Sequence, residues 1–184
     1  LTLTGATAIN GTGNILNNVL TGNGANNTLT GNAGNVTLNG GAGNDSLNGG
    51  TGNDTYQFGI GYGQDTLTDN DATAGNTDTV SAGLNPLNLV FSQSGTNLVM
   101  NLHGTTDSLT IASWYAGTAN QTEVFQAADG STLANTQIDQ LIQAMATLDV
   151  NGRVTRALLA FAEKYGRAKD GATEIRIVLT QGDI

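Results

Sequence analysis

The chain has 184 residues; 26 of them are Gly, only 1 is Pro, and charged residues make up 11%. This composition excludes collagen and a Pro-rich linker, and so few charges exclude a disordered polyelectrolyte. All six Lys and Arg residues lie between Arg153 and Arg176, so residues 1–152 carry eleven acidic side chains and no basic one except His103. Such a surface repels phosphates and anionic lipids, so we expect bound cations as partners, rather than nucleic acid or an acidic membrane.

The sequence shows no disulfide, targeting or membrane signal. The absence of Cys leaves the redox compartment open, because a secreted protein can be stabilised by something other than disulfides. No stretch resembles a signal peptide or approaches the roughly 18 apolar residues of a membrane span. The chain begins with Leu1 rather than Met, and we interpret it as a fragment of a larger, processed protein.

A nine-residue repeat occupies the first part of the sequence. Large apolar residues recur at every ninth position, with small polar residues and Gly between them: Leu20, Leu29, Leu38, Leu47 and Tyr56. This period is neither that of a helix nor that of a single strand. Each unit is predicted to form a Gly-rich turn of about six residues, followed by a short strand whose apolar residue points inward. A further copy, IGYGQDTLT, starts at Ile60 after a two-residue insertion.

Two of these units carry a specific motif. GGAGNDSLN, from Gly40, and GGTGNDTYQ, from Gly49, resemble the calcium-binding nonapeptide GGxGxDxUx of the repeats-in-toxin (RTX) family. The resemblance implies a mainly β protein with a parallel β-roll, in which two nonapeptides form one coil of about 18 residues. The turns of alternate units then stack, and two stacked turns would surround Ca²⁺ with about six oxygens. Ca²⁺ is therefore the predicted cofactor.

The resemblance also implies which residues bind the ion. Asp45 is predicted to stack with Asp65 around one Ca²⁺, and Asp54 with the acidic segment 69–71 around another. The predicted ligands, through main-chain or side-chain oxygens, are Gly40, Ala42, Asp45, Gly49, Thr51, Asp54, Gly61, Gly63, Asp65, Asp69 and Asp71. The Gly positions are expected to need backbone conformations that a Cβ would penalise.

The earlier units depart from the motif at the Asp position. Asn18, Asn27 and Val36 stand there. Neutral oxygens bind Ca²⁺ more weakly than carboxylates, and Val offers no side-chain oxygen at all. We therefore predict that the N-terminal coils are metal-poor and are held by backbone ladders and Asn hydrogen bonds.

Residues 76–134 predict a different structure. Apolar runs separated by Gly, Ser and Thr turns predict antiparallel strands over 88–91, 97–102, 108–113 and 123–126. The segment from DTVSAG to GSTL is similar to the domain that follows the repeats in haemolysin-related exoproteins, which implies a β-rich cap on the exposed end of the roll. Trp114 and Tyr115 suit a sugar-stacking platform or a packed core, and such a pair is more often core.

The C-terminal part predicts helices. Residues 135–147 are predicted to form a helix, with Thr136 and Asp139 as a capping box and apolar residues on one face: Ile138, Leu141, Ile142 and Met145. A second helix is predicted over 152–166 and a terminal strand over 174–180. The predicted domains are thus a β-roll (1–75), a β-rich cap with a terminal helix (76–147) and a helical tail (148–184).

Three hypotheses stay open for the tail, residues 148–184. The RTX resemblance implies export through a type I secretion system, which recognises an uncleaved C-terminal signal. Alternatively, the apolar stripe of the tail packs against the helix over 135–147. The third hypothesis is that the segment is non-native sequence.

Catalysis finds little support in the sequence. Cysteine chemistry and the HExxH zinc motif are absent, and no catalytic residues are predicted. His103, Asp107 and Ser108 lie too close together on a predicted hairpin for the geometry of a triad. We therefore predict a non-enzymatic, secreted Ca²⁺-binding RTX module that folds when it binds Ca²⁺ outside the cell. The alternatives are a carbohydrate-binding module with an extracellular polysaccharide as partner, and an adhesin or structural repeat.

Overall fold

The computed structural model describes residues 1–147, 168–169 and 172–173. Within this part, Leu1–Ile138 form one compact unit. The described residues contain no helix with the length and apolar character needed to cross a membrane.

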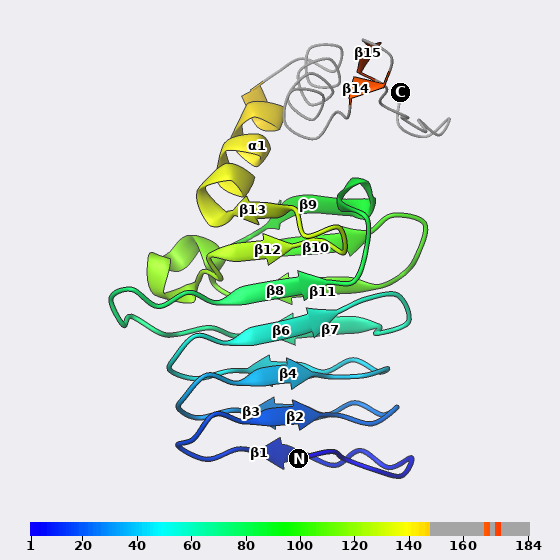
Figure 1. Ribbon diagram of the computed structural model, residues 1–184, viewed down its shortest axis with the longest axis vertical. Coiled ribbons are helices and arrows are strands. Elements are labelled where there is room, and N and C mark those ends of the chain that lie inside the picture. The colour runs from blue at the N-terminus through cyan, green and yellow to red at the C-terminus, as the bar shows by residue number, and fades with distance from the viewer. Residues whose placement is uncertain (148–167, 170–171, 174–184) are drawn as a thin grey trace. The chain divides into compact units, whose positions relative to one another are not determined.

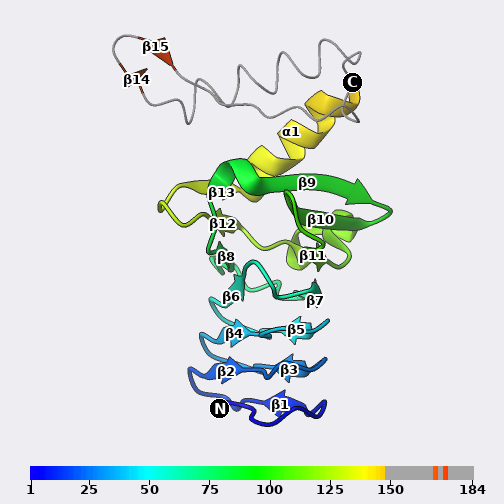
Figure 2. The same ribbon diagram turned by 90° about the vertical axis from the view of Figure 1, so that its right-hand side faces the viewer.

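Two facing sheets make up most of this unit (Figures 1 and 2). The strands of the first sheet are β1 (Gly11–Thr12), β3 (Thr28–Thr30), β5 (Ser46–Asn48), β7 (Gln64–Leu67), β9 (Leu89–Ser94), β10 (Asn97–Leu102) and β11 (Ser108–Ile111). Those of the second are β2 (Val19–Thr21), β4 (Thr37–Asn39), β6 (Thr55–Phe58), β8 (Thr79–Ala82), β12 (Val124–Gln126) and β13 (Thr132–Ala134). The spatial orders are β1-β3-β5-β7-β11-β10-β9 and β13-β12-β8-β6-β4-β2.

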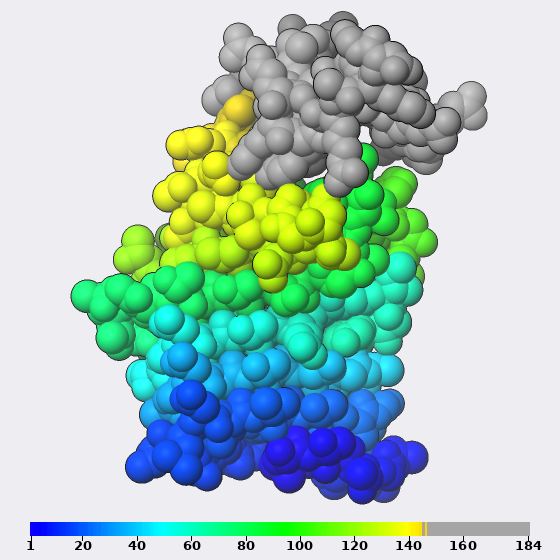
Figure 3. Space-filling model, in the orientation of Figure 1, coloured from blue at the N-terminus to red at the C-terminus, as the bar shows by residue number. Residues whose placement is uncertain are grey.

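Successive strands of the repeat region alternate between the two sheets, so each pair of nonapeptides forms one coil. Parallel pairing places Leu20 beside Leu38 and Leu38 beside Tyr56 in one sheet, and Leu29 beside Leu47 in the other. These side chains are all buried between the sheets. The coils follow one another as layers in Figure 3. The parallel β-roll predicted from the nine-residue repeat is confirmed.

The strands after residue 76 extend the same two sheets. β8 pairs in parallel with β6, β12 with β8, and β11 with β7. β9, β10 and β13 pair antiparallel with their neighbours. The prediction of antiparallel strands is therefore wrong for the pairing of β11 with β7 and of β12 with β8, which is parallel. The last coil leaves open N–H and C=O groups on two sheet edges, and these strands satisfy them.

Trp114 belongs to the core of this second region. It lies in a 3₁₀ helix, η2 (Trp114–Ala116), is 0% exposed, and packs against Phe125 with ring centroids 5.9 Å apart. Phe125 also meets Phe91 edge to face at 5.2 Å. The packed-core hypothesis for Trp114 is confirmed. Two further 3₁₀ helices are η1 (Pro86–Asn88) and η3 (Thr118–Asn120).

The predicted helix over 135–147 is present as α1 (Asn135–Thr147). At its N-terminus, Gln137 Oε1 accepts the N–H of Ala134 at 3.0 Å, and the capping box of Thr136 and Asp139 stays a prediction. Ile138 is buried, and Leu141 and Ile142 are half-buried. Two short strands, β14 (Ala168–Lys169) and β15 (Ala172–Thr173), pair with each other. The helix predicted over 152–166 and the strand predicted over 174–180 lie outside the described residues.

Candidate metal centre

The turns of the roll place equivalent residues in two columns. Each column position lies two residues before an inward-facing apolar residue of a strand. Strand register aligns Asn27, Asp45 and Asp65 in the first column. In the second column it aligns Asn18, Val36, Asp54, Asp78 and Glu123.

A hydrogen-bond ladder runs along each column. In the first column, Asp45 Oδ1 accepts the N–H of Asn27 at 2.7 Å, and Asp65 Oδ1 accepts the N–H of Asp45 at 2.9 Å. Every carboxylate here bonds to the coil before its own, with one oxygen.

The second column repeats the pattern. Asp54 Oδ1 accepts the N–H of Val36 at 2.8 Å, and Asp78 Oδ1 accepts the N–H of Asp54 at 2.6 Å. Glu123 Oε2 accepts the N–H of Asp78 at 2.7 Å. The ladder thus continues without interruption from the repeats into β12.

The second oxygen of three of these carboxylates has no hydrogen-bond partner. Asp45 Oδ2, Asp54 Oδ2 and Asp65 Oδ2 are all buried. No Lys or Arg occurs in residues 1–152, so none of the three can form an ion pair with such a residue of the roll. Buried charges without partners are strongly unfavourable. The oxygens therefore fit a bound cation.

Burial changes the acidity of these groups in the same direction. Desolvation raises the pKa of Asp45, raises that of Asp54 to about 6, and raises that of Asp65 to about 7. Hydrogen bonds from the ladder lower these pKa values but do not offset burial. A carboxylate in such a site needs either a proton or a cation to compensate its charge.

Two glycines leave room beside the orphaned oxygens. A Cβ at Gly40 would overlap Asp45 Oδ2, and a Cβ at Gly49 would overlap Asp54 Oδ2. The motif therefore requires Gly at these positions because each carboxylate folds back over the backbone of its own turn. The result is a cradle of main-chain atoms around each carboxylate.

The chemistry of these turns favours a hard cation. Among the described residues, no three His, Cys, Asp or Glu side chains form a ready cluster for a metal ion. Each turn instead contributes one carboxylate and the carbonyl groups of its Gly-rich backbone. A purely oxygen ligand set of this kind suits Ca²⁺ and disfavours Zn²⁺.

The structure brings one predicted pair together and alters the other. Asp45 lies opposite Asp65, as predicted. Asp54 lies opposite Asp78 rather than opposite the segment 69–71, because the loop before β8 is longer than a repeat turn. Asp71 still reaches the same turn, where its Oδ2 accepts the N–H of Gly52 at 3.0 Å.

Asp78 and Glu123 are column residues that the repeat spacing did not identify. Their local sequences, Asp78-Thr79-Val80 and Glu123-Val124-Phe125, repeat the order acid, any residue, buried apolar residue. This three-residue pattern could have identified both residues from the sequence. The nine-residue period did not, because Asp78 follows Asp54 by an interval that is not a multiple of nine.

Gly61 and Gly63 meet a carboxylate from the following region. Their N–H groups donate to Asp107 Oδ2 at 3.0 Å and to Asp107 Oδ1 at 2.8 Å. The bond from Gly61 is the main cause that lowers the pKa of Asp107. Asp107 thus caps the turn of Gly61 and Gly63 with both oxygens. His103 lies in the turn after β10.

The early coils have no carboxylate of their own at the column position. Asn27 Oδ1 accepts the N–H of Asn23 at 2.8 Å, and Asn27 Nδ2 donates to the carbonyl of Ile9 at 2.7 Å. Val36 is buried at the equivalent position of the other column. A neutral amide provides both donor and acceptor here, which supports the prediction that these coils are metal-poor.

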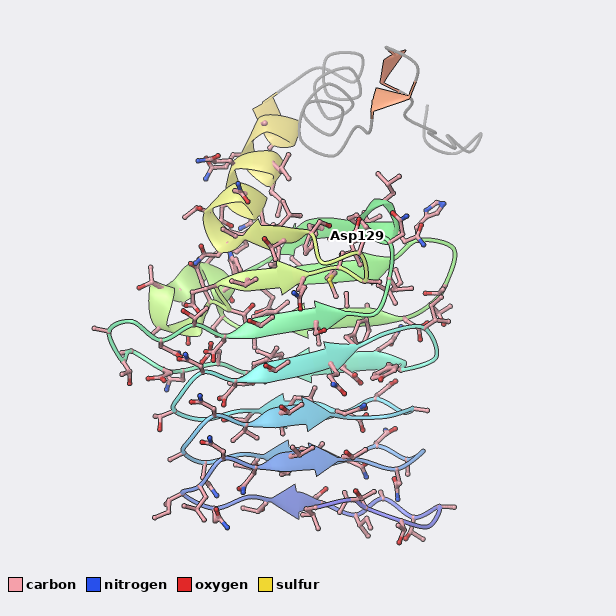
Figure 4. All side chains as sticks on the ribbon, in the orientation of Figure 1. Asp129 is labelled. Atoms are coloured by element: carbon pink, nitrogen blue, oxygen red, sulfur yellow. The ribbon has the colours of Figure 1, made fainter. Side chains whose placement is uncertain are left out.

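One acidic residue outside the columns shows the contrast. Asp129, labelled in Figure 4, lies in the turn between β12 and β13. Its Oδ1 accepts the N–H and the hydroxyl of Ser131 at 2.9 and 2.6 Å. A turn acid of this kind stabilises its own loop, whereas the column acids bond from coil to coil.

Two family models match the chain. The RTX calcium-binding nonapeptide repeat (4 copies) matches residues 12–56, and the haemolysin-type calcium binding protein related domain matches residues 97–137. The first match covers the column residues up to Asp54, and the second covers Asp107 and Glu123. The chain therefore carries RTX haemolysin-type calcium-binding nonapeptide repeats and a related haemolysin-type domain, and Ca²⁺ is the ion that these repeats bind.

Proposed function

We propose that this chain is a non-enzymatic module of a secreted protein, which folds when it binds Ca²⁺ outside the cell. The observation that carries the proposal is the set of three buried, unpartnered carboxylate oxygens on Asp45, Asp54 and Asp65. They lie in a part of the chain without Lys or Arg, which favours an external cation as the partner of their charge at neutral pH. Proteins with RTX repeats are typically exported, which agrees with a supply of Ca²⁺ at the destination.

The proposed mechanism is coupled binding and folding. At low Ca²⁺ the carboxylates repel one another and oppose closure of the coils. At saturating Ca²⁺ the ion stabilises the folded chain by mass action, by about 2.7 kcal/mol per site when its concentration is 100 times Kd. The ion neutralises carboxylates that the fold has removed from water.

The proposed ligands follow the two columns. For the first column they are Asp45 and Asp65, with main-chain oxygens of Gly40, Ala42, Gly61 and Gly63. For the second they are Asp54, Asp69 and Asp71, with main-chain oxygens of Gly49 and Thr51. Each set combines two turns, so the loss of either turn should remove the site.

Export and domain organisation are part of the same proposal. Type I secretion machinery is the proposed export partner. The tail, residues 148–184, is the proposed location of the C-terminal signal that this machinery recognises. The division into 1–75, 76–147 and 148–184 also stays a prediction. The carbohydrate-binding alternative rested chiefly on Trp114, which is buried.

A circular-dichroism titration tests the function. We expect a β signal to appear on addition of Ca²⁺ to the chelator-treated chain and to disappear with excess chelator. Mg²⁺ should substitute poorly, because its small octahedral shell tolerates crowded main-chain ligands badly. A spectrum that does not change with Ca²⁺, or an equal response to Mg²⁺ or Zn²⁺, would contradict the proposal.

A further inference from the structure

We infer that a divalent cation of the Ca²⁺ class binds at the junction between the repeats and the following region, held by Asp69 and Asp78 beside Asp54, and that Glu123 couples this ion to β12. The inference rests on the proposed Ca²⁺-binding function and deepens it. It assigns the cation to residues beyond the matched repeats, which end at residue 56.

Three carboxyl groups are buried together at this junction. Asp54, Asp69 and Asp78 are 1%, 2% and 0% exposed. Asp78 Oδ1 accepts the N–H of Asp54, and, after burial, the Asp78 carboxylate is the main cause that raises the pKa of Asp69. Neighbouring buried acids that act on each other in this way favour a shared proton or a cation between them.

Unpartnered oxygens point to a ligand in addition to the acids. Asp54 Oδ2 and Asn76 Oδ1 are buried without a hydrogen-bond partner, while Asn76 Nδ2 donates to Asp78 Oδ2 at 2.9 Å. A Cβ at Gly49 would overlap Asp54 Oδ2 and lie 2.6 Å from the hydroxyl of Tyr56. Asp54 Oδ2 and the phenol therefore face one space, and the charges of Asp69 and Asp78 act on the same phenol.

Within residues 1–147, the other charged side chains that act on these acids are also acidic. The charge of Asp71 acts on Asp54, and that of Glu123 acts on Asp69. No three of these acids form a closed cage. The ion would therefore take two carboxylates at a time and complete its shell with the Asn76 amide oxygen and carbonyl groups, the mixture that Ca²⁺ accepts.

Glu123 makes this site a junction. Its carboxylate accepts the N–H of Asp78 at 2.7 Å, and the next N–H, of Val124, donates to the carbonyl of Asp78 at 3.0 Å. The backbone of Asp78 is thus held on both sides by the start of β12. An ion on the Asp78 side chain would strengthen the pairing of β8 with β12, and Glu123 acts as a positioning residue that also adds charge.

Calorimetry of Ca²⁺ binding to the full chain tests the inference with two variants. Asp69→Asn removes a charge at a position that no repeat motif requires. Glu123→Gln keeps an oxygen that accepts the N–H of Asp78 but removes the charge. We expect each variant to weaken one site by about tenfold or more, so that one ion fewer binds at a fixed low concentration. A purely structural Glu123 would leave the ion count of Glu123→Gln unchanged.

Two further variants separate the possible failures. Asp129→Asn is the matched control, because Asp129 lies outside the columns and its Oδ1 bonds only to Ser131 in the hydrogen bonds described above, and it should keep the ion count. Asp45→Asn should lose an ion from the first column. If Asp45→Asn loses an ion while Asp69→Asn and Glu123→Gln keep the full count and affinity, the junction site is overturned and the proposed function stands. If the unchanged chain binds no Ca²⁺, the proposed function itself fails. If Asp69→Asn does not fold in saturating Ca²⁺, Glu123→Gln decides.

Discussion

Asn27 and Asp45 occupy the same position in consecutive coils and solve the same problem differently. The amide of Asn27 accepts the N–H of Asn23 in its own turn and donates to Ile9 in the coil before it. The carboxylate of Asp45 can only accept, and one of its oxygens stays without a partner. Replacement of the amide nitrogen by a carboxylate oxygen thus changes a side chain whose hydrogen bonds are satisfied into one that needs an ion.

This difference predicts opposite results for Asn27→Ala and Asp45→Ala. Asp45→Ala should lower Ca²⁺ stoichiometry and weaken Ca²⁺-induced folding, because a charged ligand is lost. Asn27→Ala should leave the stoichiometry unchanged and cost about 1–3 kcal/mol of stability, because buried main-chain partners lose their hydrogen bonds. Calorimetry counts the ions and urea unfolding measures the stability. Asn18→Ala should also keep the ion count, and a lost ion in either Asn variant would contradict the metal-poor coils.

Gly49 provides a second prediction at this scale. In Gly49→Ala the new Cβ would overlap Asp54 Oδ2, so the carboxylate must move and the affinity for Ca²⁺ should fall. Gly24→Ala is the matched control, since a Cβ there would meet no atom within 4 Å. Ca²⁺ titrations followed by circular dichroism compare the two. Equal midpoints for both variants would show that Asp54 does not need this space.

At the scale of the element, the sequence predicts where the strands lie along the chain better than it predicts which strands pair with each other. The bounds of β10 agree with the prediction over 97–102, and β4 and β5 follow from the nine-residue period. β11 pairs with β7 across more than 40 residues, and no local pattern records such a partner. The same reason explains the columns. The pairing of Asp45 with Asp65 could be predicted from the repeat, whereas the place of Asp78 in its column depends on the length of the loop before β8, which the repeat does not define.

The packing of β12 on η2 predicts the effect of Trp114→Ala. Trp114 fills the space beside Phe125, so its removal should destabilise the chain by about 3–5 kcal/mol, as for other large-to-small changes of aromatic core residues. Leu87→Ala is the control, because Leu87 is 48% exposed. Thermal unfolding in saturating Ca²⁺ measures both. An unchanged midpoint for Trp114→Ala would contradict the core role of Trp114 and would favour an exposed side chain, as a sugar-stacking platform requires.

At the scale of the whole molecule, stability depends on what neutralises the buried acids. Burial, together with Asp78, raises the pKa of Asp69 to about 8, and burial raises that of Asp65 to about 7. The ordinary value for Asp is 3.8. The folded, ion-free chain therefore binds more protons than the unfolded chain over the range between these values.

The sign of the pH dependence follows for the ion-free chain. A raised pKa in the folded state contributes stability that is complete below the unfolded value and is lost as the pH rises through the folded value. We expect the ion-free chain to keep more β signal in circular dichroism at pH 5 than at pH 8, where it should be largely unfolded. In saturating Ca²⁺ the order of stability at the two pH values should reverse, because the ion and protons compete for the same carboxylates. A β signal that does not depend on pH without Ca²⁺ would show that these acids are not buried in the ion-free chain.

The direction of the carboxylate ladder gives the molecule a polarity. Each column acid bonds to the backbone of the coil before it, so an earlier coil depends on the acid of a later one, and the later coil keeps its own acid without the earlier. Removal of coils from the N-terminal side should leave the remaining sites intact. Removal of β12 would instead remove Glu123 from the N–H of Asp78, and the loss of order at Asp78 would then weaken its bond to Asp54 in the coil before it. This roll should therefore tolerate a change in the number of coils at its N-terminal end, whereas a change at the β12 end should disturb the coils before it.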